Sequence, residues 1–148
     1  FALKTNAKGS AVFDDPGQSK LALTLGYHYA FAEFNSDQAY IRARFNVVFG
    51  SSQKVALRHL MAGSADLAIL SEAFLFREYV KDPSLKAKII RAPTDDQSYQ
   101  LSLLVRRKGP VSKEAISQIL AELQKCYCLE AFFRTFGAAE LLARKSSK

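Results

Sequence analysis

The chain has 148 residues, of which 49% are hydrophobic and 24% charged, so its composition is that of one ordinary globular domain and excludes a disordered or fibrous chain. Its formal net charge of +7 is unevenly spread. Residues 106–148 hold nine Lys and Arg against four Glu, a balance of +5, which leaves +2 for the first 105 residues. Because the basic residues are scattered over helical faces, we interpret them as a solvated surface and expect no nucleic-acid partner. No apolar run approaches the roughly 18 residues of a membrane-spanning helix.

The first twenty residues predict a strand and a connector. Residues 1–6 alternate apolar and polar side chains, which is typical of a strand. Residues 8–20 are rich in Gly, Ser, Asp and Pro, and residues 14–17 carry a turn signal, because proline presets φ and glycine accepts a positive φ. The main fold is therefore expected to begin after this connector.

Residues 20–70 predict a βαβαβ unit. Apolar runs at 20–25, 45–49 and 66–70 predict strands, and helical patterns at 29–44 and from 53 to Gly63 separate them. This alternation indicates a parallel sheet, since parallel strands need a crossover helix between them. Ligands of such sheets bind beyond the carboxyl ends of the strands. We therefore expect residues 26–29, 50–53 and 71–72 to meet at one rim.

The rest of the chain predicts three more helices and two more strands. A helix is expected over 72–81, ended by Asp82 and Pro83, and strands are expected over 86–91 and 99–106. After Gly109, two helices each place apolar residues on one face: Ile116, Ile119, Leu120 and Leu123, then Leu129, Phe132, Phe133 and Phe136. Such faces need a packing partner, so we expect self-association, with a homodimer through these helices or the outer strands as its form.

The two cysteines predict neither a disulfide nor a metal site. Cys126 and Cys128 are two residues apart, and in a helix such residues point to different faces. We therefore expect two half-buried small side chains. With His28 and His59 at distant positions, no zinc-ligand spacing can be assembled.

In this order, the segments resemble the second half of a type 2 periplasmic binding protein, in the extracellular solute-binding family 3 that includes polar amino-acid receptors. The likeness covers about residues 1–140. It depends on the strand leading into Gly26-Tyr27-His28-Tyr29, the segment from Ser52 through Gly63-Ser-Ala-Asp66 to residue 70, the strand 101–106, and the closing helix with Phe132-Phe-Arg-Thr-Phe-Gly137.

The resemblance implies an α/β fold: a lobe of the type 2 class with three αβα layers around a mixed, mostly parallel sheet, plus C-terminal helices. Residues 1–12 would form the outgoing hinge strand and connector, 13–98 the ligand-binding lobe 2, 99–107 the return hinge strand, and 108–148 helices that normally pack on lobe 1. It further implies a periplasmic or extracytoplasmic location, a small polar ligand and membrane transporter subunits as partners. No cofactor, metal or catalytic residue is expected.

The expected ligand-binding residues are Gly26, Tyr27, His28, Tyr29, Ser51, Ser52, Ser71 and Glu72. Glycine lets the backbone approach a ligand, and the helix start that follows offers N–H donors to a carboxylate. Tyr27 and Tyr29 can instead be packing residues and His28 a solvated turn residue. Ser51, Ser52 and Gln53 can either hydrogen-bond a ligand or cap the helix that follows them. Asp66 begins a strand away from the rim, so we interpret it as structural.

Position 71 departs from the pattern of the family. Amino-acid-binding relatives carry a carboxylate at the end of this strand, which takes the ammonium group of the ligand. Here Ser71 stands at that position and Glu72 follows it. Glu72 either replaces the missing acid or stabilises the start of a helix.

Uptake by an ABC-type transporter and sensing by a receptor both fit this reading. A transcriptional regulator's effector domain is an alternative use of the same fold. A dehydratase-like enzyme is another, with Glu72 and His28 as the only candidates for a general acid. A second lobe, largely preceding residue 1, would complete the cleft.

Overall fold

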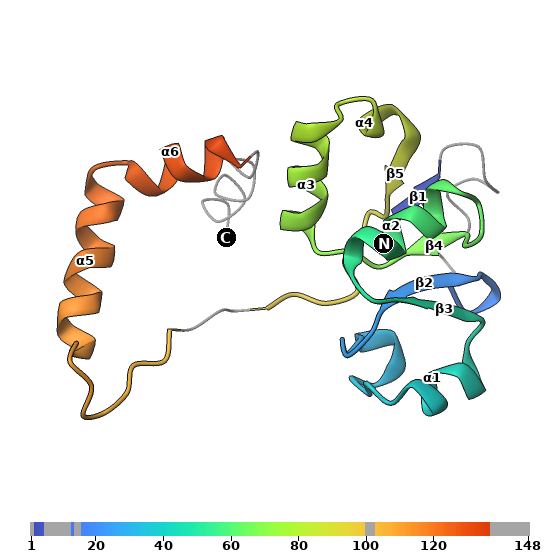
Figure 1. Cartoon of the computed structure of the whole chain (residues 1–148), viewed down its shortest axis with the longest axis horizontal. Helices are drawn as coiled ribbons and strands as arrows, with labels where there is room; N and C mark the ends of the chain where they lie inside the picture. The colour runs from blue at the N-terminus through green and yellow to red at the C-terminus, as the bar shows by residue number, and fades with distance from the viewer. Residues whose placement is uncertain (1, 5–12, 14–15, 100–102, 137–148) are drawn as a thin grey trace. The chain divides into compact units, whose positions relative to one another are not determined.

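The computed structural model describes residues 2–4, 13, 16–99 and 103–136, and the chain divides into two compact units (Figure 1). Unit 1 spans Phe1–Ser98 and unit 2 spans Tyr99–Lys148. Among the described residues, unit 1 contains all the strands, and unit 2 contains two helices.

Unit 1 is built on a five-stranded sheet with the order β3-β2-β4-β1-β5. Strand β2 lies between β3 and β4 and is parallel to both, whereas β1 lies between β4 and β5 and is antiparallel to both. The predicted mixed, mostly parallel sheet and the βαβαβ unit are thereby confirmed. The strands are β1 (Ala2–Lys4), β2 (Leu21–Thr24), β3 (Val47–Gly50), β4 (Leu67–Ala68) and β5 (Ile89–Arg91).

Helical segments cover both faces of this sheet (Figure 1). Alternate strand residues face opposite sides, and Leu21 and Leu23 pack with Tyr29 and Ile41, which belong to the segment holding the 3-10 helix η3 (Ala30–Ala32) and α1 (Gln38–Arg44). On the other face, α2 (Gln53–Met61) contacts β2, β3 and β4. The described part of unit 1 is therefore a mixed α/β unit with its core on either side of β2.

The predicted helix over 29–44 is wrong in its first half. Only η3 forms there, and Glu33 and Phe34 follow it with φ angles of 57° and 58°. Two consecutive left-handed residues cannot continue a right-handed helix. Asp37 then starts α1, because its carboxylate accepts hydrogen bonds from the amides of Ala39 and Tyr40 at 2.7 and 3.0 Å.

The caps of α2 agree with the sequence prediction. The Ser52 hydroxyl accepts a hydrogen bond from the Val55 amide at 3.4 Å, and Gly63 follows the helix with a φ of 72°. Only glycine adopts this angle without strain, so Gly63 ends the helix as expected. The strand expected at 66–70 is shorter, since β4 contains two residues.

Helix α3 (Glu72–Lys81) has the predicted bounds, but the strand expected at 86–91 is half helix. Asp82 ends α3, and a new turn starts at once: the amides of Leu85 and Lys86 donate to the carbonyls of Asp82 and Pro83 at 3.1 and 3.2 Å. The short helix α4 (Leu85–Lys88) therefore precedes β5. A further 3-10 helix, η2 (Pro16–Gln18), lies in the expected connector.

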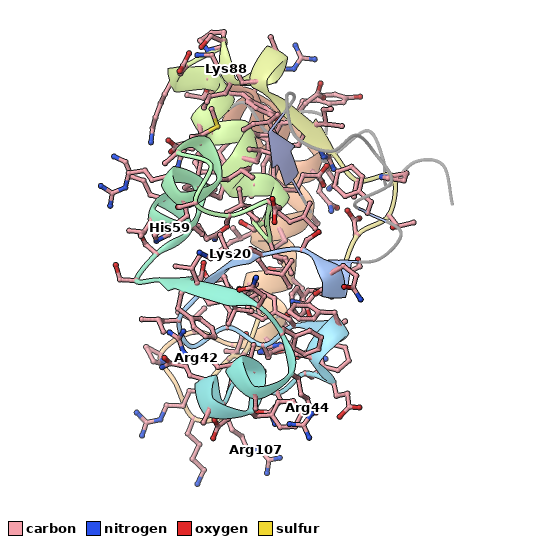
Figure 2. The ribbon with its side chains drawn as sticks, turned by 90° about the vertical axis from the view of Figure 1, so that its right-hand side faces the viewer. Lys20, Arg42, Arg44, His59, Lys88 and Arg107 are labelled. Carbon is pink, nitrogen blue, oxygen red and sulfur yellow. A yellow bond between two sulfur atoms is a disulfide. The ribbon has the colours of Figure 1, made fainter. Side chains whose placement is uncertain are left out.

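Basic side chains of unit 1 come from several elements. Arg42 and Arg44 lie on α1, and Lys20, His59 and Lys88 lie before β2, on α2 and on α4 (Figure 2). The Arg42 and Arg44 guanidinium carbons stand 4.8 and 3.8 Å from the ring centroids of Phe49 and Tyr40. These contacts are cation–π interactions at the surface.

Unit 2 contains α5 (Lys113–Lys125) and α6 (Cys128–Thr135). The Ser112 hydroxyl caps α5 by accepting a hydrogen bond from the Ala115 amide at 3.1 Å. The strand expected at 99–106 does not form in its described part, because residues 103–106 have no strand partner and Leu104 is 96% exposed. Residues 100–102 of that expected strand lie outside the described residues.

A disulfide joins Cys126 and Cys128, contrary to the prediction. The prediction assumed one continuous helix, but the helix breaks here. Tyr127 has a φ of 55°, so the two cysteines stand on either side of a left-handed residue with their Cα atoms 5.2 Å apart. That separation suits a disulfide. Both cysteines are exposed and not half-buried.

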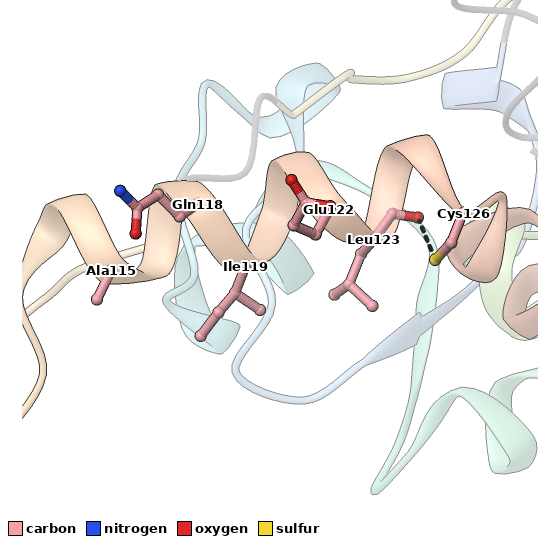
Figure 3. A pocket seen from close by; sticks show the side chains of 6 residues that line it. All are labelled: Ala115, Gln118, Ile119, Glu122, Leu123 and Cys126. Carbon is pink, nitrogen blue, oxygen red and sulfur yellow. Dashed lines mark hydrogen bonds between the residues drawn. The ribbon is translucent and has the colours of Figure 1, made fainter.

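The apolar faces of α5 and α6 are largely uncovered. Ile119, Phe132 and Phe136 are 53%, 57% and 48% exposed, and neither helix has a buried residue. A shallow hollow of about 500 Å³ runs along successive turns of α5 (Figure 3), lined by Ala115, Gln118, Ile119, Glu122, Leu123 and Cys126. The self-association expected from these faces stays a prediction. In the part of the chain that the structure describes, no helix has the length and apolarity to cross a bilayer.

Candidate functional site

Three loops meet at the carboxyl edge of the sheet, where the sequence places the candidate residues. Strands β2, β3 and β4 point the same way, so the segments that follow them lie on one rim. The side chain of Gln53 joins these segments. Its Nε2 donates to the Tyr27 hydroxyl oxygen at 3.3 Å, and its Oε1 accepts from the Ser71 amide at 2.6 Å. We call this set, Tyr27, Gln53 and Ser71, the Gln53 bridge.

Gln53 belongs to the segment 50–53 that the sequence places at the rim, and it lies at the centre of that rim. It is the first residue of α2, directly after the Ser52 cap. A long amide side chain at that position can reach both neighbouring loops. Its place after a strand and a cap is the signal that sequence reasoning offers, but its two partners are 26 and 18 residues away.

We expect Gln53→Leu to lower the free energy of unfolding by about 1 kcal/mol, because it removes two hydrogen bonds and leaves the Ser71 amide to water. Urea denaturation and hydrogen exchange at the Ser71 amide measure the effect. Gln38→Leu is the matched control, since Gln38 is the exposed first residue of α1. An equal loss in both variants would contradict the bridge.

Gly26, Tyr27 and His28 form an exposed part of the rim. Gly26 has a φ of 74°, which favours glycine, and an added Cβ would meet no atom within 4 Å. Tyr27 is 47% exposed. The carbonyl of His28 accepts a hydrogen bond from Gln97 Nε2 at 2.9 Å, and its ring lies 6.2 Å from that of Phe34. The side chains of Tyr27 and His28 are thus accessible from solvent.

Tyr29 is a core residue, which corrects its expected place in the binding set. It is 1% exposed, and its hydroxyl accepts a hydrogen bond from the Thr24 amide at 2.7 Å and donates to the Thr24 carbonyl at 3.1 Å. Burial raises the pKa of Tyr29 to about 12, against the opposing effect of its hydrogen bonds to Thr24. Tyr29 therefore hydrogen-bonds to the last residue of β2 and does not face a ligand.

The N–H donors expected to receive a ligand carboxylate are occupied by Asp96. Its Oδ2 accepts a hydrogen bond from the Ala30 amide and its Oδ1 one from the Phe31 amide, both at 3.0 Å. Asp96 belongs to the loop after β5, and Gln97 of the same loop bonds to His28. The protein's own carboxylate thus satisfies the first amides of η3, so an anion-binding helix start at Tyr29 is not available as predicted.

The three serines lie at the rim, and two of them cap helices. Ser52 caps α2, and the Ser71 hydroxyl caps α3 by accepting a hydrogen bond from the Phe74 amide at 3.3 Å. Ser51 is exposed in the turn between β3 and α2. Capping and ligand contact are compatible, because a hydroxyl has one donor and two acceptor positions.

Glu72 forms an ion pair that the sequence did not predict. Its Oε1 lies 2.7 Å from Arg91 Nη2, and the two side chains are 26% and 29% exposed. Arg91 is the last residue of β5, which runs in the same direction as β4, so its Cα lies at the same edge of the sheet. The rim therefore contains a compensated charge pair.

Asp66 is structural, as predicted. Its Oδ2 accepts a hydrogen bond from the Lys20 amide at 2.9 Å, which ties the beginning of β4 to that of β2. Among the residues that the structure describes, no group of three or more His, Cys, Asp and Glu side chains is placed to hold a metal ion.

Comparison with models of protein families, with curated proteins and with solved structures finds no match to this chain. The chemistry of the rim is accordingly assigned from its own groups. Tyr27, Gln53, Ser51 and Arg91 provide hydrogen-bond donors at a solvent-accessible edge. Such an arrangement can bind a small polar molecule without bond making or breaking.

Proposed function

We propose that this chain is part of an extracytoplasmic solute-binding protein, in which the rim of unit 1 supplies one wall of a cleft for a small polar metabolite. Unit 1 would be the ligand-binding lobe of the type 2 class with its αβα layers. The module would serve ABC-type uptake or sensing and would not be an enzyme. The geometry of the rim supports this proposal better than a catalytic role, since no nucleophile and base are paired among its described residues.

The observation that carries the proposal is the position of two strand ends, the amino end of β1 and the carboxyl end of β5. The antiparallel strand β1 has its amino end, and β5 its carboxyl end, at the edge where the Gln53 bridge lies. The first residue of β1, Ala2, is the register partner of Arg91, the last of β5. The amino end of β1 and the carboxyl end of β5 therefore lie side by side next to the candidate site.

This arrangement suits a two-lobe mechanism. In a two-lobe protein, these neighbouring strand ends would join unit 1 to the second lobe. They can act as a hinge, because small changes in their backbone angles turn one lobe against the other. A ligand that contacts both walls favours the closed arrangement by its differential affinity. The loop after β5 fits this role, since Asp96 and Gln97 attach the segment after β5, which leads to the expected return strand, to the segment after β2.

We expect a small polar ligand to perturb the amide NMR signals of residues 26–28, 51–53 and 71–72 in the ¹⁵N-labelled chain. The test set contains amino acids, polyamines and dicarboxylates at millimolar concentration, because a single wall buries less of a ligand than a complete cleft and binds weakly. Perturbation confined to α5, where the hollow of unit 2 lies, would argue against the proposed site. Absence of any perturbation would overturn the function.

A further inference from the structure

The Glu72–Arg91 pair decides which charge the rim offers to a ligand. The two groups are 2.7 Å apart and about three-quarters buried, so solvent screens their attraction less than at an open surface. Glu72 is also the first residue of α3, where the helix dipole stabilises a carboxylate. Arg91 and the helix dipole of α3 therefore both stabilise the negative charge of Glu72 in the absence of a ligand.

An ammonium group would have to compete with Arg91 for Glu72. Displacement of the guanidinium leaves a partly buried positive charge without its partner, which is costly. Arg91 is in addition held by the ring of Phe76, with its guanidinium carbon 5.8 Å from the ring centroid. The rim is thus poorly suited to the ammonium end of an amino acid.

Arg91 keeps the capacity to bind an acceptor. The ion pair joins Nη2 to a single carboxylate oxygen, whereas a guanidinium carries five N–H donors in a planar fork. Its side chain is 29% exposed, so Arg91 is partly accessible from solvent.

Two side chains of the Gln53 bridge, Tyr27 and Gln53, each keep a hydrogen that can be donated to a ligand. Tyr27 accepts from Gln53 Nε2, which leaves the hydroxyl hydrogen of Tyr27 to be donated. The carbonyl oxygen of Gln53 is engaged by the Ser71 amide, while Nε2 has a second hydrogen. The side-chain amide of Gln53 consequently keeps one hydrogen to donate, beside the second lone pair of its carbonyl oxygen.

We infer that the ligand presents a carboxylate to this rim, that Arg91 binds this carboxylate, and that Glu72 positions Arg91 and does not receive an ammonium group. The inference rests on the proposed solute-binding function and names the chemical class of its ligand. A small carboxylic acid without an amino group at the bound end is the expected occupant.

The test uses the whole ¹⁵N-labelled chain and two probes of equal carbon number and opposite charge, succinate and 1,4-diaminobutane. Succinate is expected to shift the signals of residues 51–53, 71–72 and 91, and diaminobutane is not. Arg91→Gln should weaken succinate binding about tenfold or more, since a charge-assisted hydrogen bond is lost. Glu72→Gln should strengthen it roughly two- to threefold, because the competing carboxylate is removed. Arg91→Lys should retain intermediate affinity.

The pair Glu130 and Arg134 on α6 provides charge-matched controls. Glu130→Gln and Arg134→Gln change the net charge by the same amounts as Glu72→Gln and Arg91→Gln, but at positions far from the rim residues in the sequence. Both controls should leave succinate binding unchanged. Diaminobutane binding at the rim, weakened by Glu72→Gln, would overturn the inference and leave the proposed function standing. If the rim residues respond to neither probe and to none of the wider metabolite set, both the inference and the proposed function are overturned. If Arg91→Gln does not fold, the opposite responses of Arg91→Lys and Glu72→Gln decide.

Discussion

Tyr29→Phe is expected to lower the free energy of unfolding at neutral pH by about 2 kcal/mol, because the change leaves the buried Thr24 amide without its acceptor. It also removes one of two hydrogen bonds to the Thr24 carbonyl, which still accepts from the Tyr27 amide at 3.3 Å. Thr24 is 3% exposed, so water cannot replace the lost hydroxyl easily. Chemical denaturation of the wild type and the variant measures the difference.

The same residue predicts an alkaline loss of stability. The pKa of Tyr29 rises from 10.0 to about 12 on folding, so between these values the unfolded chain releases a proton that the folded chain retains. Stability therefore falls as the pH rises from 10 to 12, by up to about 3 kcal/mol for this group. Tyr29→Phe lacks this contribution, and its deficit relative to the wild type should shrink over that range.

Tyr27→Phe is the control for both effects. Tyr27 is 47% exposed and gives up a single 3.3 Å contact, so its unfolding free energy should change by less than about 1 kcal/mol. It keeps Tyr29 and should show the alkaline loss of the wild type. A constant difference between wild type and Tyr29→Phe from pH 8 to 12 would contradict the assignment of that loss to Tyr29.

The parts of the fold that sequence reasoning predicts are those with local signals. The end of helix α3 follows from the Asp82-Pro83 stop, which lies directly after its last residue. Strand β2 follows from an apolar run, because a strand buried on both faces needs apolar residues throughout. The parallel order of β2, β3 and β4 follows from the helices between them.

The errors arise where the outcome depends on distant residues or on unusual backbone angles. Nothing in the composition marks Glu33 and Phe34 as left-handed, since glycine is the usual signal for such angles. Tyr27 and Tyr29 are chemically alike in the sequence, and only the packing of the sheet separates the exposed ring from the buried one.

The candidate site shows the same limit. Its rim was predictable from the order of strands, but its internal contacts were not. Asp96 reaches Ala30 across 66 residues, and Arg91 reaches Glu72 across the intervening strand β1. A sequence pattern has no period that links such positions. The charge available to a ligand is therefore decided by contacts that only the folded chain reveals.

Asp96→Ala should destabilise unit 1 by about 2 to 3 kcal/mol, because two amides lose a charged acceptor at once. The Ala30 and Phe31 amides should then exchange with solvent faster, and the His28 carbonyl should lose its bond from Gln97 as the loop loosens. Urea denaturation and hydrogen exchange measured by NMR follow these changes.

Asp96→Asn should lower the free energy of unfolding by about half as much as Asp96→Ala does. An amide side chain has one acceptor oxygen, whereas the carboxylate has two. Asp95→Ala is the matched control, because Asp95 is an exposed acid in the same loop. If Asp95→Ala and Asp96→Ala speed exchange at Ala30 and Phe31 equally, the general flexibility of the loop, and not the carboxylate of Asp96, protects these amides. Faster exchange only in the Asp96 variants would show that this carboxylate attaches the segment after β5 to the rim.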